Sequence, residues 1–196
     1  MMCLKPSQLF VGRLGRYTLD SLAAPPVSHI WAANSNDGRR VILKFRKEET
    51  KDDFLMDREK ENLKRFRSPY IRSLVDTPAE EHRGPPFLVL ENMDVSIPDM
   101  WKARQEPPLR EVITSLLRAL KVIHAENYVH TGTIPFKLEV DRIWLMSDIC
   151  ILPLTDIEPR NILLSKVGSP DMEVKLADFE NGNTRSYKDG YHNCNH

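Results

Sequence analysis

Two acids and an amide in the C-terminal part of the sequence have the types and the spacing that phosphoryl transfer requires. Asp156 and Asn161 stand five positions apart in DIEPRNILL, and Asp178 follows in VKLADFEN. One carboxylate can orient an attacking hydroxyl and accept its proton, while an amide and a second carboxylate can hold the magnesium ion that neutralises the phosphates. The plainer alternative is an ordinary hairpin with solvated acids at its ends.

Two short apolar runs are expected to position these side chains. Residues 162–164 and 174–177 are split by the turn sequence Gly168-Ser169-Pro170-Asp171. Such a pattern predicts two strands around a turn, with Asn161 before the first strand and Asp178 after the second.

The composition is that of a globular chain without a strong net electrostatic field. The 196 residues are 41% hydrophobic, which is enough for a core, and they carry 28 basic and 28 acidic side chains. We therefore expect no nucleic-acid partner and no anionic membrane surface. Cys3, Cys150 and Cys194 lack metal-ligand spacing and suit free thiols in an intracellular compartment, cytoplasmic or nuclear. We find no secretory signal and no apolar run long enough to span a bilayer.

The first third of the sequence predicts a small sheet with one helix. The β-rich run 41–45 follows the turn signal Asn36-Asp37-Gly38, and residues 29–33 can pair with it as a hairpin. Helical spacing of apolar residues begins after Asp52 in DDFLMDREKENLKRF. Further strands are indicated by the runs 71–75 and 87–90.

The strongest helical pattern covers residues 109–125. Its apolar residues repeat at i, i+3, i+4 and i+7, so one face must be buried: Leu109, Val112, Ile113, Leu116, Leu117, Leu120 and Ile123. Before this helix, Pro98, Pro107 and Pro108 predict a connection between lobes and not an element of its own.

Several stretches of the first half resemble motifs of the eukaryotic protein kinases, in the divergent form common in fungi. Lys44 in VILKF resembles the strand lysine that holds the nucleotide phosphates, and Glu59 in DREKENL resembles the helix glutamate that pairs with it. Leu90 and residues 91–93, in FLVLENM, resemble the gatekeeper and the hinge that receive the adenine. Taken singly, Lys44 would be a solvent-facing side chain of an edge strand and Glu59 a solvated helix acid.

The second half continues the resemblance in the correct order. His130, Thr131 and Asp156 resemble the H-R-D motif, Asn161 the asparagine of the catalytic loop, and residues 178–180 the D-F-G motif. The H-R-D histidine has a structural role in this family. Five motifs in order are more specific than any one of them alone.

The resemblance implies an α+β, protein-kinase-like two-lobe fold. A complete, small β-rich N-lobe is expected over residues 14–93, a partial helical C-lobe over 94–185, and a disordered tail over 186–196. ATP and Mg²⁺ are the implied cofactors, and a protein carrying a Ser or Thr hydroxyl is the implied substrate or partner, while the oligomeric state stays open. The implied catalytic residues are Asp156, Lys44 and Glu59; the nucleotide-binding residues are Lys44, Glu91, Met93, Asn161 and Asp178; and the metal ligands are Asn161 and Asp178.

Four departures from the family pattern predict an impaired activity. No glycine occurs in residues 17–31, where a Gly-rich loop would cover the phosphates, and Thr131 replaces the usual arginine. Glu158 stands where many kinases have a lysine, and Glu180 replaces the glycine of D-F-G. A unit charge about 4 Å away is worth roughly 4 kcal/mol at an effective dielectric near 20, so Glu158 facing the phosphate would slow transfer by orders of magnitude.

Two other functional classes therefore stay open. One is a non-catalytic, pseudokinase-like binding module or a truncated gene product. The other is a small-molecule kinase of the aminoglycoside-phosphotransferase type, which shares the Asp and Asn of the catalytic loop, lacks the following lysine and often has an acidic residue two positions after the metal-binding aspartate, as Glu180 is here.

Residues 132–155 interrupt the resemblance. They separate Thr131 from Asp156, although without them the chain would read YVHTDIEPRNILL. The block is apolar and long for a loop between packed elements, so we weigh a retained intron against a true insertion that binds a partner. After residue 180 no A-P-E motif follows, so the apolar face of helix 109–125 is expected to be only partly covered.

Overall fold

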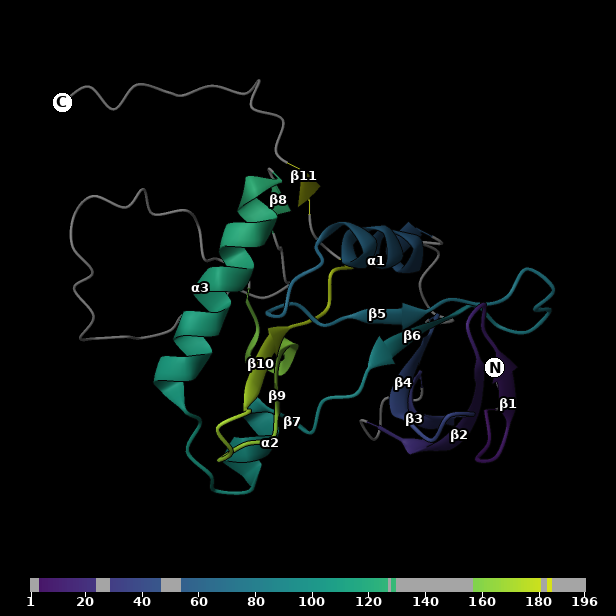
Figure 1. The fold of residues 1–196 in the computed structure, drawn as a ribbon, viewed down its shortest axis with the longest axis horizontal. Coiled ribbons are helices and arrows are strands. Elements are labelled where there is room, and N and C mark those ends of the chain that lie inside the picture. The colour runs from purple at the N-terminus through teal and green to yellow at the C-terminus, as the bar shows by residue number, and fades with distance from the viewer. Residues whose placement is uncertain are drawn as a thin grey trace.

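The computed structural model describes residues 4–23, 29–46, 54–126, 128–129, 157–180 and 183–184 (Figure 1). The predictions for His130, Thr131, Asp156, the block 132–155 and the tail 186–196 lie outside these residues. The fold is α+β: a curled six-stranded antiparallel sheet is joined to a second part made of helices and short strands. No helix in the described part of the chain is long and apolar enough to cross a membrane.

The six-stranded sheet forms the first part of the molecule. Its strands occur in the order β1 (Leu9–Val11), β2 (Arg16–Leu22), β3 (Ile30–Ser35), β4 (Arg40–Phe45), β6 (Phe87–Glu91) and β5 (Leu74–Asp76), and all neighbours are antiparallel. The predicted hairpin is confirmed, since β3 pairs with β4 and Gly38 lies in the turn with φ of 82°. The predicted strand at 71–75 is shorter, because β5 begins at Leu74.

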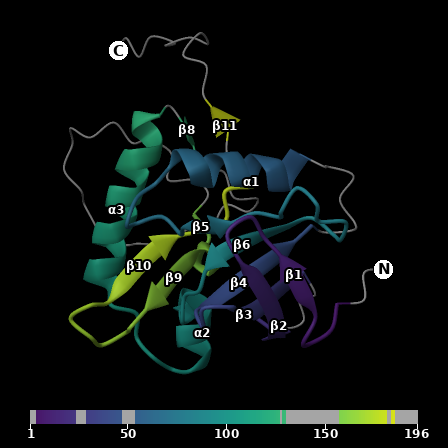
Figure 2. The same ribbon diagram turned by 45° about the vertical axis from the view of Figure 1, so that its right-hand side comes forward.

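The two edges of this sheet meet. Gly12 forms an antiparallel bridge with Pro78, the Arg13 N–H donates to the Thr77 carbonyl at 3.0 Å, and the Ala79 N–H donates to Val11 at 3.2 Å. The end of β1 thus bonds to the segment after β5. Figure 2 shows the curl of the sheet that brings them together. The inside is filled by one apolar cluster: Phe10, Tyr17, Leu19, Trp31, Ala33, Val41, Leu43, Phe45, Phe87 and Val89.

The other face of the sheet packs on helix α1 (Phe54–Arg65) and on the second part of the molecule (Figure 1). Because side chains alternate along a strand, Leu43 points inward and Ile42 and Lys44 point to this second core. The core combines residues far apart in the sequence: Ala32, Ile42, Leu63, Phe66, Ile71, Leu88, Leu90, Ala119, Leu120, Ile123, Tyr128, Leu176 and Phe179. It therefore fixes the sheet against the segment that carries Asp178.

The second part is built from short strands and two helices. Its elements are β7 (Val95–Ser96), α2 (Ile97–Lys102), α3 (Leu109–Ala125), β8 (Tyr128–Val129), a 3₁₀ turn (Pro159–Asn161), β9 (Ile162–Ser165), β10 (Glu173–Leu176) and β11 (Asn183–Thr184). The sheets have the orders β10-β9-β7 and β11-β8. Helix α3 matches the predicted range, and the β9–β10 hairpin is confirmed as antiparallel.

Helix α2 contradicts the prediction that the Pro-rich stretch holds no element. Pro98 lies in the first turn of the helix, where a missing N–H costs nothing, and the Ser96 hydroxyl caps that end by accepting from the Asp99 N–H. Ile97 and Met100 are buried on the second part's own core. The prolines at 107 and 108 do precede α3, as a connection.

The apolar face of α3 is partly covered, as expected. Val112, Ala119, Leu120 and Ile123 are buried. Toward the N-terminal half of the helix, Leu109, Ile113 and Leu117 remain 64%, 46% and 57% exposed. These three residues lie at i, i+4 and i+8, so they form a single exposed stripe.

Candidate functional site

A buried ion pair joins the sheet to helix α1. Lys44 lies on β4, an interior strand between β3 and β6, and its Nζ is 2.7 Å from Oε2 of Glu59 on α1. Lys44 is 7% exposed and Glu59 is 2% exposed. The structure thus contradicts both plainer interpretations, the solvent-facing lysine of an edge strand and the solvated helix acid.

Two more carboxylates contact the same ammonium group. Asp178 Oδ1 lies 3.2 Å and Glu180 Oε1 lies 2.9 Å from Lys44 Nζ. Glu180 is buried, whereas the side chain of Asp178 is 35% exposed. From the sequence, Glu180 was a departure from the protein-kinase pattern and the expected acid of the small-molecule kinase alternative, but its contact with Lys44 was not predicted.

The segment 178–180 is held in place by its central residue. Phe179 is fully buried, with its ring 5.9 Å from that of Phe66, and its carbonyl accepts from Asn62 Nδ2 at 3.0 Å. The same Asn62 amide donates to the Tyr128 hydroxyl at 2.8 Å. Asp178 has φ of 64°, a left-handed conformation that is strained for a residue with a side chain. Anchoring of Phe179 to α1 thus directs both flanking acids to Lys44.

The cluster carries three carboxylates against one ammonium. Burial by itself would lower the pKa of Lys44. The carboxylates of Glu59, Asp178 and Glu180 outweigh that effect and raise the pKa, so Lys44 is protonated at neutral pH. Burial raises the pKa of Glu59, although Lys44 opposes this. The acids therefore have an excess of negative charge that a further cation could balance.

The donor set fits a hard divalent cation. Glu59, Asp178 and Glu180 each offer a carboxylate oxygen, and these oxygens all lie within 4.8 Å of one another. Carboxylates are the ligands that Mg²⁺ prefers in proteins. Lys44 touches the same three groups, so a metal ion and this ammonium would share them.

Asn161 and Asp178 lie at the same end of the β9–β10 hairpin. Leu176 pairs with Ile162 at that end, and the Ala177 N–H donates to the Asn161 carbonyl at 2.8 Å. Asn161 is buried at the end of its 3₁₀ turn. The spacing of these two residues in the sequence therefore becomes proximity in space, as the hairpin predicted.

Glu158 has a cation of its own. It is buried just before the 3₁₀ turn, and its carboxylate pairs with the guanidinium of Arg160. The predicted effect of Glu158 on a bound phosphate is correspondingly weakened, because its charge is balanced locally.

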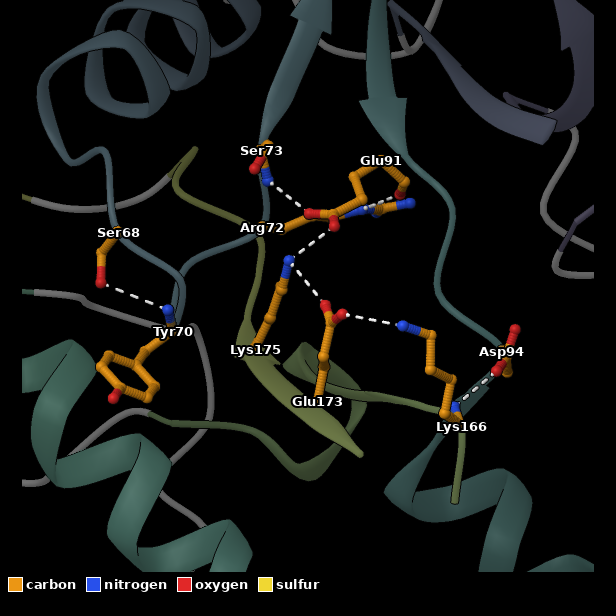
Figure 3. Close-up of polar contacts among 9 residues, drawn as sticks. All are labelled: Ser68, Tyr70, Arg72, Ser73, Glu91, Asp94, Lys166, Glu173 and Lys175. Atoms are coloured by element: carbon orange, nitrogen blue, oxygen red, sulfur yellow. Dashed lines mark hydrogen bonds and ion pairs between the residues drawn. The ribbon is translucent and has the colours of Figure 1, made fainter. Parts of the chain in front are cut away.

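Glu91 is the last residue of β6, and Met93 lies just beyond it. Glu91 is part of a polar network (Figure 3). Lys175 Nζ on β10 lies 2.5 Å from Glu91 Oε1, and the Ser73 N–H donates to Oε2 at 3.1 Å. The Glu91 carbonyl accepts from Arg72 Nε at 2.9 Å. Met93 is partly exposed, and its N–H donates no hydrogen bond to any of the described residues.

Sequence reasoning missed Arg72. It lies in the run IRSLV, which was predicted as a strand. A basic residue inside that strand was the one feature that could have indicated a functional role. In the structure it lies beside the Lys44 cluster, within the electrostatic reach of Glu59 and Asp178.

Comparison with known proteins gives no family: no protein-family model matches the chain, and no curated protein matches it significantly.

Proposed function

We propose that this chain is a protein-kinase-like phosphotransferase that binds ATP with Mg²⁺ and transfers a phosphoryl group to a Ser or Thr hydroxyl of a protein, at an impaired rate. The observation that carries the proposal is the buried Lys44–Glu59 pair with Asp178 beside it, 2.7 Å and 3.2 Å from the lysine. The family motifs in which these three residues occur add weight, as does the α+β fold.

Each residue has a role in this proposal. Lys44, held by Glu59, would neutralise the nucleotide phosphates, while Asp178 and Asn161 would hold Mg²⁺. The metal would supply charge neutralisation and orientation of the phosphates. Asp156, outside the described residues, would orient the acceptor hydroxyl and take its proton.

The contact of Glu180 with Lys44 supports impairment. A phosphate that binds this ammonium must displace or compete with a carboxylate 2.9 Å away. The same contact favours a second candidate, a non-catalytic binding module in which the ion cluster serves to hold α1 against residues 178–180.

Glu180 also bears on the small-molecule kinase alternative. An acid two positions after Asp178 lies within the group of oxygens that could hold a metal ion. In that alternative Glu180 would be a metal ligand, and its removal would weaken Mg²⁺ binding.

Nucleotide-dependent thermal stability tests the proposal. Mg-ATP, with Mg-GTP in parallel, should stabilise the full chain, by about 2.7 kcal/mol at a hundredfold excess over the dissociation constant. Lys44→Met should abolish the shift, whereas Lys121→Met, at an exposed position of α3, should keep it. Phosphate transfer to a protein substrate would support the enzyme, and nucleotide binding without turnover would support the binding module. No shift with either nucleotide would refute the proposal.

A further inference from the structure

Arg72 is held by its backbone against the strand that leads to Asp178. Its N–H donates to the Leu176 carbonyl at 2.9 Å, and the neighbouring Ile71 forms a parallel bridge with the same Leu176. From there the side chain extends to the end of β6, where Nε donates to the Glu91 carbonyl (Figure 3). The guanidinium therefore has a fixed position.

The guanidinium has donors to spare. Nε makes the bond to Glu91, but the two terminal nitrogens make no hydrogen bond to any residue in the described part of the chain. The side chain is partly buried, and burial lowers the pKa of Arg72 to about 10 against the opposing effect of Glu59, Glu91 and Asp178. A partly buried cation with unused, directional donors can bind a ligand.

Lys44 and the Glu91 carbonyl that Arg72 binds lie along the same pair of strands. In the β4–β6 pairing, Lys44 is opposite Leu88 and Val41 is opposite Glu91, so Glu91 is three residues along the strand, about 10 Å. This is the order of length of a nucleotide from its phosphates to the far edge of its base. A nucleotide with its phosphates on Lys44 can therefore place its base at Glu91 and Arg72.

Arg72 brings unused donors to this end of the site. An adenine amino group needs an acceptor, but the Glu91 carbonyl already accepts from Arg72, and a second donor there would lie against a cation. Guanine offers two adjacent acceptors, O6 and N7, which a guanidinium can bind in a bidentate manner. The unused N–H of Met93 adds one more donor nearby.

We infer that Arg72 makes the base end of this site selective for guanine over adenine, so that the preferred nucleotide is Mg-GTP. The inference rests on the proposed function, because it requires phosphates on Lys44. It assigns to Arg72 a role in specificity and leaves the transfer step unchanged.

Competitive binding of Mg-GTP and Mg-ATP to the full chain tests this inference. We expect the wild type to bind Mg-GTP between about fivefold and a hundredfold more tightly. Arg72→Met should lose that preference by weakening GTP and, because the Glu91 carbonyl is freed, strengthening ATP. Arg72→Lys keeps the charge but lacks the bidentate fork, so it should also lose most of the preference. Arg83→Met, at an exposed site, is the matched control and should bind as the wild type does.

The outcomes separate the two proposals. Equal or tighter binding of Mg-ATP by the wild type, unchanged in Arg72→Met, would overturn the role of Arg72 and leave the proposed function intact. Failure of both nucleotides to bind both the wild type and the folded Arg72→Met variant would overturn the two together. Circular dichroism and thermal melting establish that each variant is folded.

Discussion

Glu180 binds the ammonium of Lys44 at 2.9 Å, nearly as closely as Glu59 does at 2.7 Å. The residue two positions after Asp178 thus supplies a third carboxylate of the lysine's ion cluster. Glu59 and Glu180 are both buried, so both carboxylates hold the ammonium of Lys44 inside the protein and not at its surface. Lys44 must weaken one of these bonds before it can hold a phosphate.

Removal of the Glu180 charge is therefore expected to tighten nucleotide binding. A hydrogen bond to a charged group is worth about 1.5 kcal/mol or more, so Glu180→Gln and Glu180→Gly should each lower the dissociation constant about tenfold. Isothermal titration with Mg-ATP and Mg-GTP measures this, with the exposed Glu111→Gln as control. Weaker binding that more Mg²⁺ restores would instead identify Glu180 as a metal ligand, the small-molecule kinase alternative.

The sequence predicted the local parts of this site well. A β-run with Lys44, a helical pattern with Glu59 and a hairpin between Asn161 and Asp178 all depend on short-range periodicity and turn residues, which a single sequence displays. The range of α3 was predictable for the same reason. Pro98 misled only because a proline in the first turn of a helix reads like a loop residue.

The parts that could not be predicted depend on long-range contacts. The bridge between Gly12 and Pro78, which closes the sheet, joins segments whose sequences carry no sign of each other. The direction of Arg72 likewise depends on where Glu91 and Leu176 meet. Glu180 was visible as a departure, but its partner became clear only when Phe179 was seen to be anchored on α1.

Loss of the Lys44 charge is expected to destabilise the fold, because it leaves Glu59 buried without its cation. Lys44→Met should lower the free energy of unfolding by about 3–5 kcal/mol at neutral pH, measured by urea denaturation. The double variant Lys44→Met with Glu59→Gln should recover much of this loss. If the double variant is no more stable than the single one, the buried charge is not the cause.

The same variant should show a distinctive pH dependence. Burial raises the pKa of Glu59 above its ordinary 4.5, and removal of Lys44 takes away the cation that opposes the rise most closely. The pKa of Glu59 is higher in the folded than in the unfolded state, so between these two pKa values the folded state binds more protons. The free energy of unfolding therefore increases as the pH falls toward 4.5. The deficit of Lys44→Met relative to the wild type should therefore shrink on acidification. A deficit that is constant from neutral pH to pH 4.5 would contradict this.

Closure of the sheet depends on the small size of Gly12. Asp76 is buried and accepts from the Tyr17 hydroxyl at 2.8 Å and from the Leu14 N–H at 2.9 Å. A Cβ on Gly12 would lie 2.2 Å from Asp76 Oδ2 and 2.8 Å from the Tyr17 ring. Burial, and then Asp76, raises the pKa of Tyr17, so the hydroxyl remains a donor.

Gly12→Ala should therefore destabilise the protein by about 1–3 kcal/mol, through overpacking and disturbed hydrogen bonds. Amide exchange at Arg13 and Ala79, whose N–H groups bond across the closure, should accelerate in this variant. Gly15→Ala, whose Cβ would have Asn36 Oδ1 as its nearest neighbour at 3.0 Å, should have the smaller effect. Equal effects of the two substitutions would count against the closure as the cause.

Arg72 offers a test in which stability and binding should move in opposite directions. Burial lowers its pKa from 12.5 to about 10 although Glu59, Glu91 and Asp178 oppose the shift, so the fold holds this charge at a cost in stability. Arg72→Met fills much of the same space without a charge. We expect the free energy of unfolding to rise by about 1–2 kcal/mol in urea denaturation, while the guanine preference is lost. Arg83→Met, which removes an exposed charge, should change stability by less than about 0.5 kcal/mol. A residue that is retained for ligand recognition at the expense of stability should be replaceable without loss to the fold. A marked loss of stability in Arg72→Met would therefore contradict this role. It would identify Arg72 as a structural bridge between β5, β6 and β10.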